Sequence, residues 1–176
     1  MGGVMESRQE LDQLYSLAYE ELHRLAGAAL RREGFASISP TTLVHEAWLK
    51  LRASRQLDVE SPLHFKRIAG RAMRQVLVEA ARRRNAAKRG SGLVLVTFDE
   101  ALGQPGSTDE HFLALDAALQ DLAQLYPRQA EMIEGRYFDG LTVPETAELL
   151  GISEATVNRD WRAARAWLAV ELRDAS

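Results

Sequence analysis

The sequence contains no cysteine, which excludes a disulfide scaffold, a cysteine-ligated zinc site and thiol catalysis. Its four histidines, His23, His45, His64 and His111, lie far apart and show no metal-ligand spacing. No apolar run approaches the ~20 residues that span a bilayer. The first residues, 1–14, lack the apolar stretch of a secretory signal. We therefore expect a cytoplasmic protein that is not an enzyme, with no catalytic residues, metal or cofactor.

The composition is that of an ordinary globular protein. The chain has 176 residues, of which 46% are hydrophobic and 27% charged, and this balance argues against full-length disorder. At roughly 100–200 residues per domain, this length allows one domain or two small ones.

Charge is divided unevenly along the chain. Residues 1–89 hold 16 Lys and Arg against 10 Asp and Glu, whereas residues 90–176 hold 6 against 15. The imbalance is steepest at 61–89, with nine basic residues and one acid, and at 99–121, with six acids and no base. Such a split indicates a polyanion-binding half joined to a half of opposite charge, or else a solvated surface with uneven charge.

Apolar residues recur at helical spacing in both halves, so we predict an all-α fold. One helix is expected over 7–32, and Ser-Pro pairs at 39–40 and 61–62 predict the starts of two more. The apolar run at 93–98 has no partner strand and is interpreted as part of a flexible linker at 90–110. We therefore predict two small helical domains, 8–89 and 111–174, and expect limited proteolysis to cut first between Gly103 and Ser107.

Residues 142–168 carry the strongest motif, a helix-turn-helix. Ala147 is small enough for close helix approach, Gly151 suits a tight turn, and Val157 fills the angle between the helices. Ser153 is a good N-cap for the second helix. An ordinary helical hairpin with solvated arginines is the alternative. The residues predicted to contact duplex DNA are Ser153, Glu154, Thr156, Asn158, Arg159, Arg162 and Arg165.

The basic segment within 64–89 is a less specific signal for nucleic acid. Its cations could follow a phosphate backbone, and Phe65 and Trp48 could stack on unpaired bases. The alternative places both aromatic rings in the core. The residues predicted to contact a melted strand are Phe65, Lys66, Arg67, Arg71, Arg74, Arg82, Arg83 and Arg84.

Taken together, these blocks resemble the extracytoplasmic-function (ECF) group of sigma-70 factors over about residues 8–170. Residues 43–51 look like sigma region 2.2, residues 65–89 like regions 2.3 and 2.4, and residues 128–168 like region 4. The resemblance implies an alternative sigma factor that binds the clamp and flap of core RNA polymerase. It also implies that the first half melts the promoter minus-10 element and the second reads the minus-35 element. An anti-sigma factor is a further partner that the resemblance suggests.

Two features depart from the usual family pattern. Family members often carry Asn and Asp where this chain has Arg71 and Gln75, and an acidic stretch before region 2.2 that binds the clamp. Here that stretch reads Ser39-Pro40-Thr41-Thr42 and has no acidic residue. The sequence of residues 72–90 is similar to that of an ECF-like subgroup associated with Ser/Thr kinases. We therefore expect Thr41 or Thr42 to be phosphorylated, which would supply the missing charge. The alternative is that Ser39 only caps the helix and the threonines only begin it, with polymerase held by other contacts. The predicted polymerase-binding residues are Ser39, Thr41, Thr42, Leu43, Glu46 and Trp48.

A stand-alone helix-turn-helix regulator is the second hypothesis. Such a regulator would usually carry a ligand-binding or dimerisation domain before its DNA-binding motif. This chain has a basic helical block there instead, which favours the sigma factor.

Overall fold

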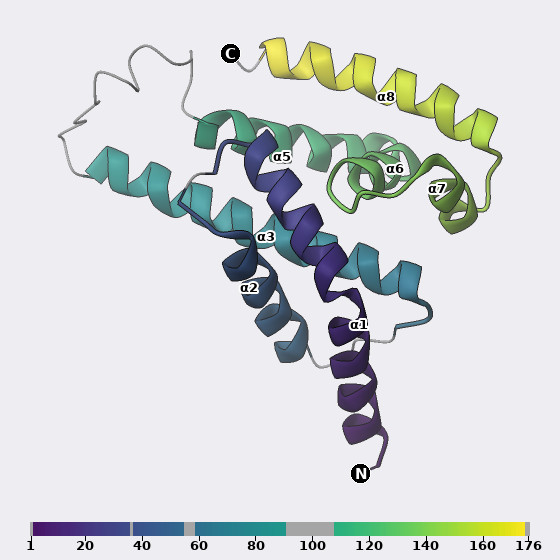
Figure 1. The fold of residues 1–176 in the computed structure, drawn as a ribbon. Helices are drawn as coiled ribbons and strands as arrows, with labels where there is room; N and C mark the ends of the chain where they lie inside the picture. Colours follow the sequence, from purple (N-terminus) through teal and green to yellow (C-terminus); the bar gives the residue numbers. More distant parts are fainter. Residues whose placement is uncertain (1, 36, 55–58, 91–107, 175–176) are drawn as a thin grey trace.

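The computed structural model describes residues 2–35, 37–54, 59–90 and 108–174 (Figure 1). These residues form helices and contain no strand, so the all-α prediction is confirmed. The helices are α1 (Gly2–Arg32), α2 (Pro40–Ala53), α3 (Pro62–Gly90), α5 (Thr108–Leu125), α6 (Pro127–Tyr137), α7 (Val143–Leu150) and α8 (Glu154–Asp174). The apolar run at 93–98, most of the predicted linker and the predicted cleavage site lie outside the described residues.

Local signals set the helix starts in the first half as the sequence predicts. The Ser39 hydroxyl accepts a hydrogen bond of 3.1 Å from the Thr42 backbone N–H, and Pro40 occupies the first helical position. Ser61 does the same for α3 by accepting from His64 N–H at 3.1 Å. Elsewhere the helices extend further than the sequence predicts, because α1 begins at Gly2 rather than at residue 7, and α5 begins at Thr108, inside the predicted linker.

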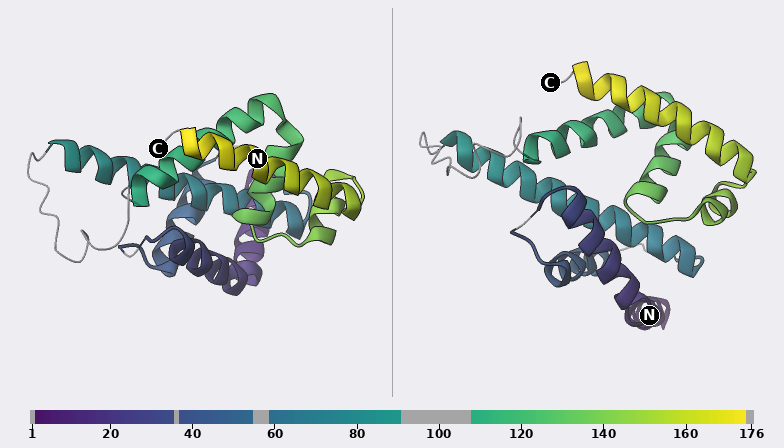
Figure 2. Two further views of the ribbon diagram at one scale, coloured as in Figure 1. Left: turned by 90° about the horizontal axis from the view of Figure 1, so that it is seen from above. Right: turned by 45° about the horizontal axis from the view of Figure 1, so that its top comes forward.

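Helix α3 is the centre of the molecule. It packs against α1 and α2 on one side and against α5, α6 and α7 on the other. Figure 1 and the two views in Figure 2 show α3 running between these two groups of helices. Helix α8 packs on α5, α6 and α7 but not on α3, and the right-hand view in Figure 2 shows the two helices apart.

A continuous apolar core joins the two halves of the chain. The ring of Phe112 on α5 contacts Phe35 edge-on at 5.2 Å between ring centroids, and Phe138 at 6.4 Å. Phe112 is only 1% exposed. The halves therefore pack on each other, and the division into independent domains at 8–89 and 111–174 stays a prediction.

Candidate nucleic-acid interface

The turn between α7 and α8 has the geometry of a helix-turn-helix. Gly151 ends α7 with φ 61°, a left-handed conformation that residues with a Cβ rarely adopt. Ser153 caps α8 by accepting a 3.2 Å hydrogen bond from Thr156 N–H. At the other end of α7, Thr142 and Glu145 form a reciprocal capping box. Hydrogen bonding of Glu145 to the Thr142 backbone N–H lowers the pKa of this carboxyl group.

Helix α8 buries one face and exposes the other. Val157, Ala164 and Leu168 are buried, and the side chain of Trp161 is half-buried beneath the Arg136 guanidinium, 4.3 Å from the ring centroid. Asp160 is buried and ion-paired with Arg128 on α6 at 2.6 Å. These contacts fix the rotation of α8 about its own axis.

The exposed face of α8 carries most of the predicted duplex contacts. All but the half-buried Thr156 are exposed. Arg162 Nε donates to the Asn158 carbonyl at 3.2 Å, and Arg159 Nε donates to the carboxylate of Asp160 at 3.4 Å. The exposed residues are Ser153, Glu154, Asn158, Arg159, Arg162 and Arg165. An arginine-bearing helix face of this kind can enter a major groove and contact base edges or phosphates.

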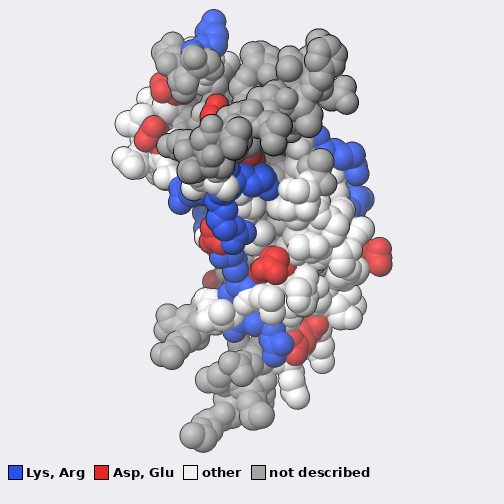
Figure 3. Space-filling view, turned by 90° about the vertical axis from the view of Figure 1, so that its left-hand side faces the viewer, with Lys and Arg blue, Asp and Glu red and all other residues white. Residues whose placement is uncertain are grey.

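Most of the basic residues on α3 that are predicted to bind a melted strand form ion pairs with carboxylates of the same chain. Arg74 is 11% exposed in its side chain and contacts Asp116 and Glu134, both from the second half of the chain. Arg84 pairs with Asp109 at 2.5 Å, and Lys66 lies between Glu21 and Glu145 at 2.7 and 3.6 Å. Arg67 pairs with Glu131, and Arg71 with Glu134 at 3.3 Å. Arg82 and Arg83 are exposed, and Figure 3 shows Lys and Arg side chains in a band with carboxylates beside it.

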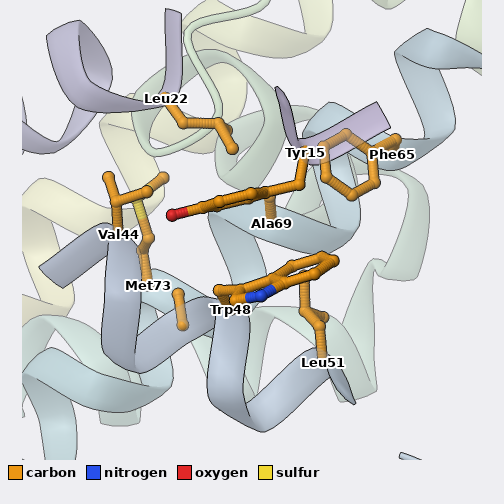
Figure 4. A pocket seen from close by; sticks show the side chains of 9 residues that line it. Tyr15, Leu22, Val44, Trp48, Leu51, Phe65, Ala69 and Met73 are labelled. Carbon is orange, nitrogen blue, oxygen red and sulfur yellow. The ribbon is translucent and has the colours of Figure 1, made fainter. Parts of the chain in front are cut away.

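The two aromatic side chains that could stack on bases lie in the core in this conformation. Phe65 is 1% exposed, and Trp48 is 7% exposed with its ring stacked on Tyr15 at 4.3 Å between centroids. Figure 4 shows these three rings lining one small apolar pocket with Met73. The core placement left open by the sequence is therefore the one that the structure shows.

The first turn of α2 brings together the predicted polymerase-binding hydroxyls. Thr41 and Thr42 are exposed, and no acidic residue lies in this turn. Thr42 Oγ1 lies 2.8 Å from Ser39 Oγ, and Thr41 Oγ1 lies 3.3 Å from His23 Nε2 on α1. Of the other predicted contacts, Glu46 is exposed, whereas Leu43 and Trp48 are buried.

Two groups at the contact between the halves were missed from the sequence. Tyr137 donates a 2.7 Å hydrogen bond to Glu33, and burial together with this bond raises the pKa of Tyr137 to about 12. Asp139 is 1% exposed and packs against Gly70 of α3 with no hydrogen-bond partner on either carboxyl oxygen. Burial, reinforced by Glu134, raises the pKa of Asp139 well above its ordinary value. Both residues contact partners that are far away in the sequence, so no local sequence signal marks them.

Across 2–35, 37–54, 59–90 and 108–174, no group of three or more His, Cys, Asp or Glu side chains is placed to hold a metal ion. Within the same ranges, no helix combines the length and the apolar character needed to cross a membrane.

Comparison with known proteins identifies the family of this chain. The model of the ECF sigma factor family matches residues 7–174, nearly the whole chain. No curated protein and no solved structure matches it. The chain therefore belongs to the ECF sigma factor family, whose members are transcription initiation factors rather than enzymes. Membership implies core RNA polymerase and promoter DNA as its partners.

Proposed function

We propose that this ECF sigma factor reads the minus-35 element with the exposed face of α8 and holds the melted minus-10 strand on α3. The observation that carries the proposal is the geometry of α7 and α8. Their turn is capped at both sides, and the buried face of α8 fixes which arginines point outward. In the first half, α3 carries cations along its length, and Arg82 and Arg83 are exposed towards its C-terminal end. Run-off transcription with core polymerase on promoter templates tests this function.

The start of α2 is the proposed contact with the polymerase clamp. This contact lacks the carboxylates that would pair with basic clamp side chains, because Ser39, Thr41 and Thr42 are neutral. Glu46 is the one exposed acid on α2. The unmodified protein should therefore bind core polymerase weakly.

Phosphorylation of Thr41 or Thr42 by a Ser/Thr kinase would supply the missing charge. A phosphate adds about -1.5 to -2 charges and three acceptor oxygens, and a helix N-terminus favours such an anion. Both threonines are exposed to a kinase, and Thr41 lies beside His23, whose ring N–H can donate to a phosphate oxygen. This arrangement fits the kinase-associated subgroup of ECF-like factors.

The phosphorylation proposal is tested by measuring core-polymerase affinity and run-off transcription before and after kinase treatment. We expect phosphorylation to increase both for the wild type and not for Thr41→Ala/Thr42→Ala. Ser16→Ala, which removes an exposed hydroxyl from α1, is the control and should respond like wild type. The proposal fails if the unmodified protein already binds tightly and drives transcription, or if the double alanine variant still responds.

A further inference from the structure

We propose that the acidic second half of the chain competes with nucleic acid for the basic face of α3, so that it must move off α3 before a DNA strand can bind there. This inference rests on the proposed role of α3 in holding the minus-10 strand. It adds a built-in inhibitory contact that acts before any partner protein is involved.

Arg74 is the centre of this contact. Its Nη1 donates to Glu134 Oε1 at 2.6 Å and its Nη2 to Asp116 Oδ1 at 2.7 Å, so both ends of the guanidinium are engaged. Gln120 holds the other oxygen of Asp116 at 2.7 Å. With side-chain exposures of 11% for Arg74, 9% for Asp116 and 15% for Glu134, the three charges are shielded from water. A phosphate cannot reach Arg74 while both carboxylates are in place.

The pairing extends to other basic residues at both ends of this face, although Arg82 and Arg83 stay exposed. Towards the start of α3, Arg67 pairs with Glu131, and Lys66 lies between Glu145 and Glu21 of the first half. Towards its end, Arg84 pairs with Asp109, and its guanidinium lies 4.6 Å from the centroid of the Phe35 ring. The acids come from α5, α6 and α7, which together cover one side of α3.

Close packing accompanies the ion pairs. Gly70 lies at the contact, and a Cβ there would overlap the carboxyl group of Asp139. The two halves therefore approach each other at a point where α3 has no side chain. An added methyl group should separate them without changing any charge.

Competition follows from the chemistry of the two ligands. Carboxylates and phosphates bind the same guanidinium nitrogens. Each cation of α3 that is paired with a carboxylate is therefore not available to a DNA phosphate. When only the open fraction of a protein can bind, its apparent dissociation constant rises in inverse proportion to that fraction. Weakening the contact should therefore tighten strand binding without adding any group to the DNA-binding surface.

The first test neutralises the acids and leaves every predicted DNA-binding residue intact. Asp116→Asn/Glu134→Gln should bind a fluorescein-labelled thymidine-rich single strand about tenfold more tightly than wild type. The control Asp121→Asn/Glu148→Gln removes the same charge from exposed positions of the second half and should change binding by less than about twofold. Equal affinities for the two double variants would overturn the proposal, because only general charge would then matter.

The second test opens the contact sterically. Gly70→Ala should also tighten strand binding, because the added Cβ pushes the halves apart. The substitution should not unfold α3, since alanine has a higher helix propensity than glycine. Gly27→Ala in α1 is the matched control, because its added Cβ would meet only Arg31 and Pro40 of the same half. Unchanged strand binding by Gly70→Ala, with helical content retained by circular dichroism, would count against the proposal.

Spin-label distances report opening directly. The chain has no cysteine, so Ala53→Cys and Gln124→Cys place one label on an exposed position of each half. Electron–electron distance measurements should show a longer population in Asp116→Asn/Glu134→Gln and in Gly70→Ala than in the otherwise wild-type chain. Identical distances overturn the inhibitory contact. Absence of promoter-dependent transcription with core polymerase, for the phosphorylated wild type and for every variant, would instead overturn the proposed function.

Discussion

Replacing Asp139 with asparagine should raise the free energy of unfolding at neutral pH, although it removes an acidic group from a fold rich in ion pairs. Asp139 is 1% exposed, and neither of its carboxyl oxygens has a hydrogen-bond partner. Burial is the main cause of its raised pKa, and the neighbouring carboxylate of Glu134 adds to it. Three nearby guanidinium groups act in the opposite direction and do not offset burial: Arg67, Arg71 and Arg74.

The sign of the pH dependence follows from this shift. Below the ordinary value of 3.8, Asp139 is protonated in both the folded and the unfolded chain, and its contribution to stability is fully present. As the pH rises above that value, the unfolded chain releases the proton while the folded chain retains it. The contribution is then lost progressively until the pH passes the raised pKa of the folded state. Asparagine does not titrate, so this loss should be absent in Asp139→Asn.

The magnitude at neutral pH is set by the extra cost of a buried carboxyl group that must either retain its proton or carry an unpaired charge. Such a group costs about 1–3 kcal/mol, and more when it is charged. Because the amide and the protonated carboxyl group have similar shapes, both variants bear a similar cost in acid. We expect Asp139→Asn to be more stable than wild type by about 1–3 kcal/mol at pH 7.5, with a difference that shrinks towards pH 4.

Urea unfolding followed by tryptophan fluorescence measures this difference across the pH range. Asp121→Asn is the control, since it removes an exposed carboxylate from α5 and should stay within about 0.5 kcal/mol of wild type. A gain for Asp139→Asn that is the same at every pH would refute the reasoning, because titration of Asp139 would then not be its source. A loss of stability at neutral pH would refute it more directly.

Two further predictions concern the shared core and the DNA-reading helix. Phe112→Ala should lower the free energy of unfolding by about 3–5 kcal/mol, since this ring is 1% exposed and contacts Phe35 and Phe138. Urea unfolding checks this, and a loss below 1 kcal/mol would show that the core readily closes around the gap. Arg162→Ala and Arg165→Ala should each weaken promoter duplex binding, by about 1–3 kcal/mol for a base contact or with a flatter salt dependence for a phosphate contact. Fluorescence anisotropy with labelled duplex distinguishes the two cases, and unchanged binding by both single variants and the double would contradict the assignment.

Features that depend on neighbouring residues in the sequence were predictable. Ser39-Pro40 and Ser61-Pro62 start helices because capping uses groups within one turn. The helix-turn-helix was visible for the same reason, since Gly151 and Ser153 act on adjacent backbone groups.

Features that depend on how the halves pack were not predictable. Arg74 was expected to contact DNA, yet its partners are Asp116 and Glu134, which lie 42 and 60 residues away. The opposite charges of the two halves were the available signal. The charge difference does not identify which residues pair. The register between packed helices depends on the fit of their side chains, as where Asp139 packs against Gly70.

The closed arrangement affects the two proposed DNA contacts differently. Arg162 and Arg165 are exposed on α8, which does not pack against α3, so they can reach duplex DNA while the halves remain in contact. Arg74 and Arg84 are engaged with acids of the second half, so a melted strand cannot use them until the contact opens. In this proposal, packing of the two halves therefore weakens single-strand binding by α3 and does not affect duplex binding by α8. Opening must draw its free energy from a partner that binds the open form more tightly, and in the proposed function that partner is core polymerase.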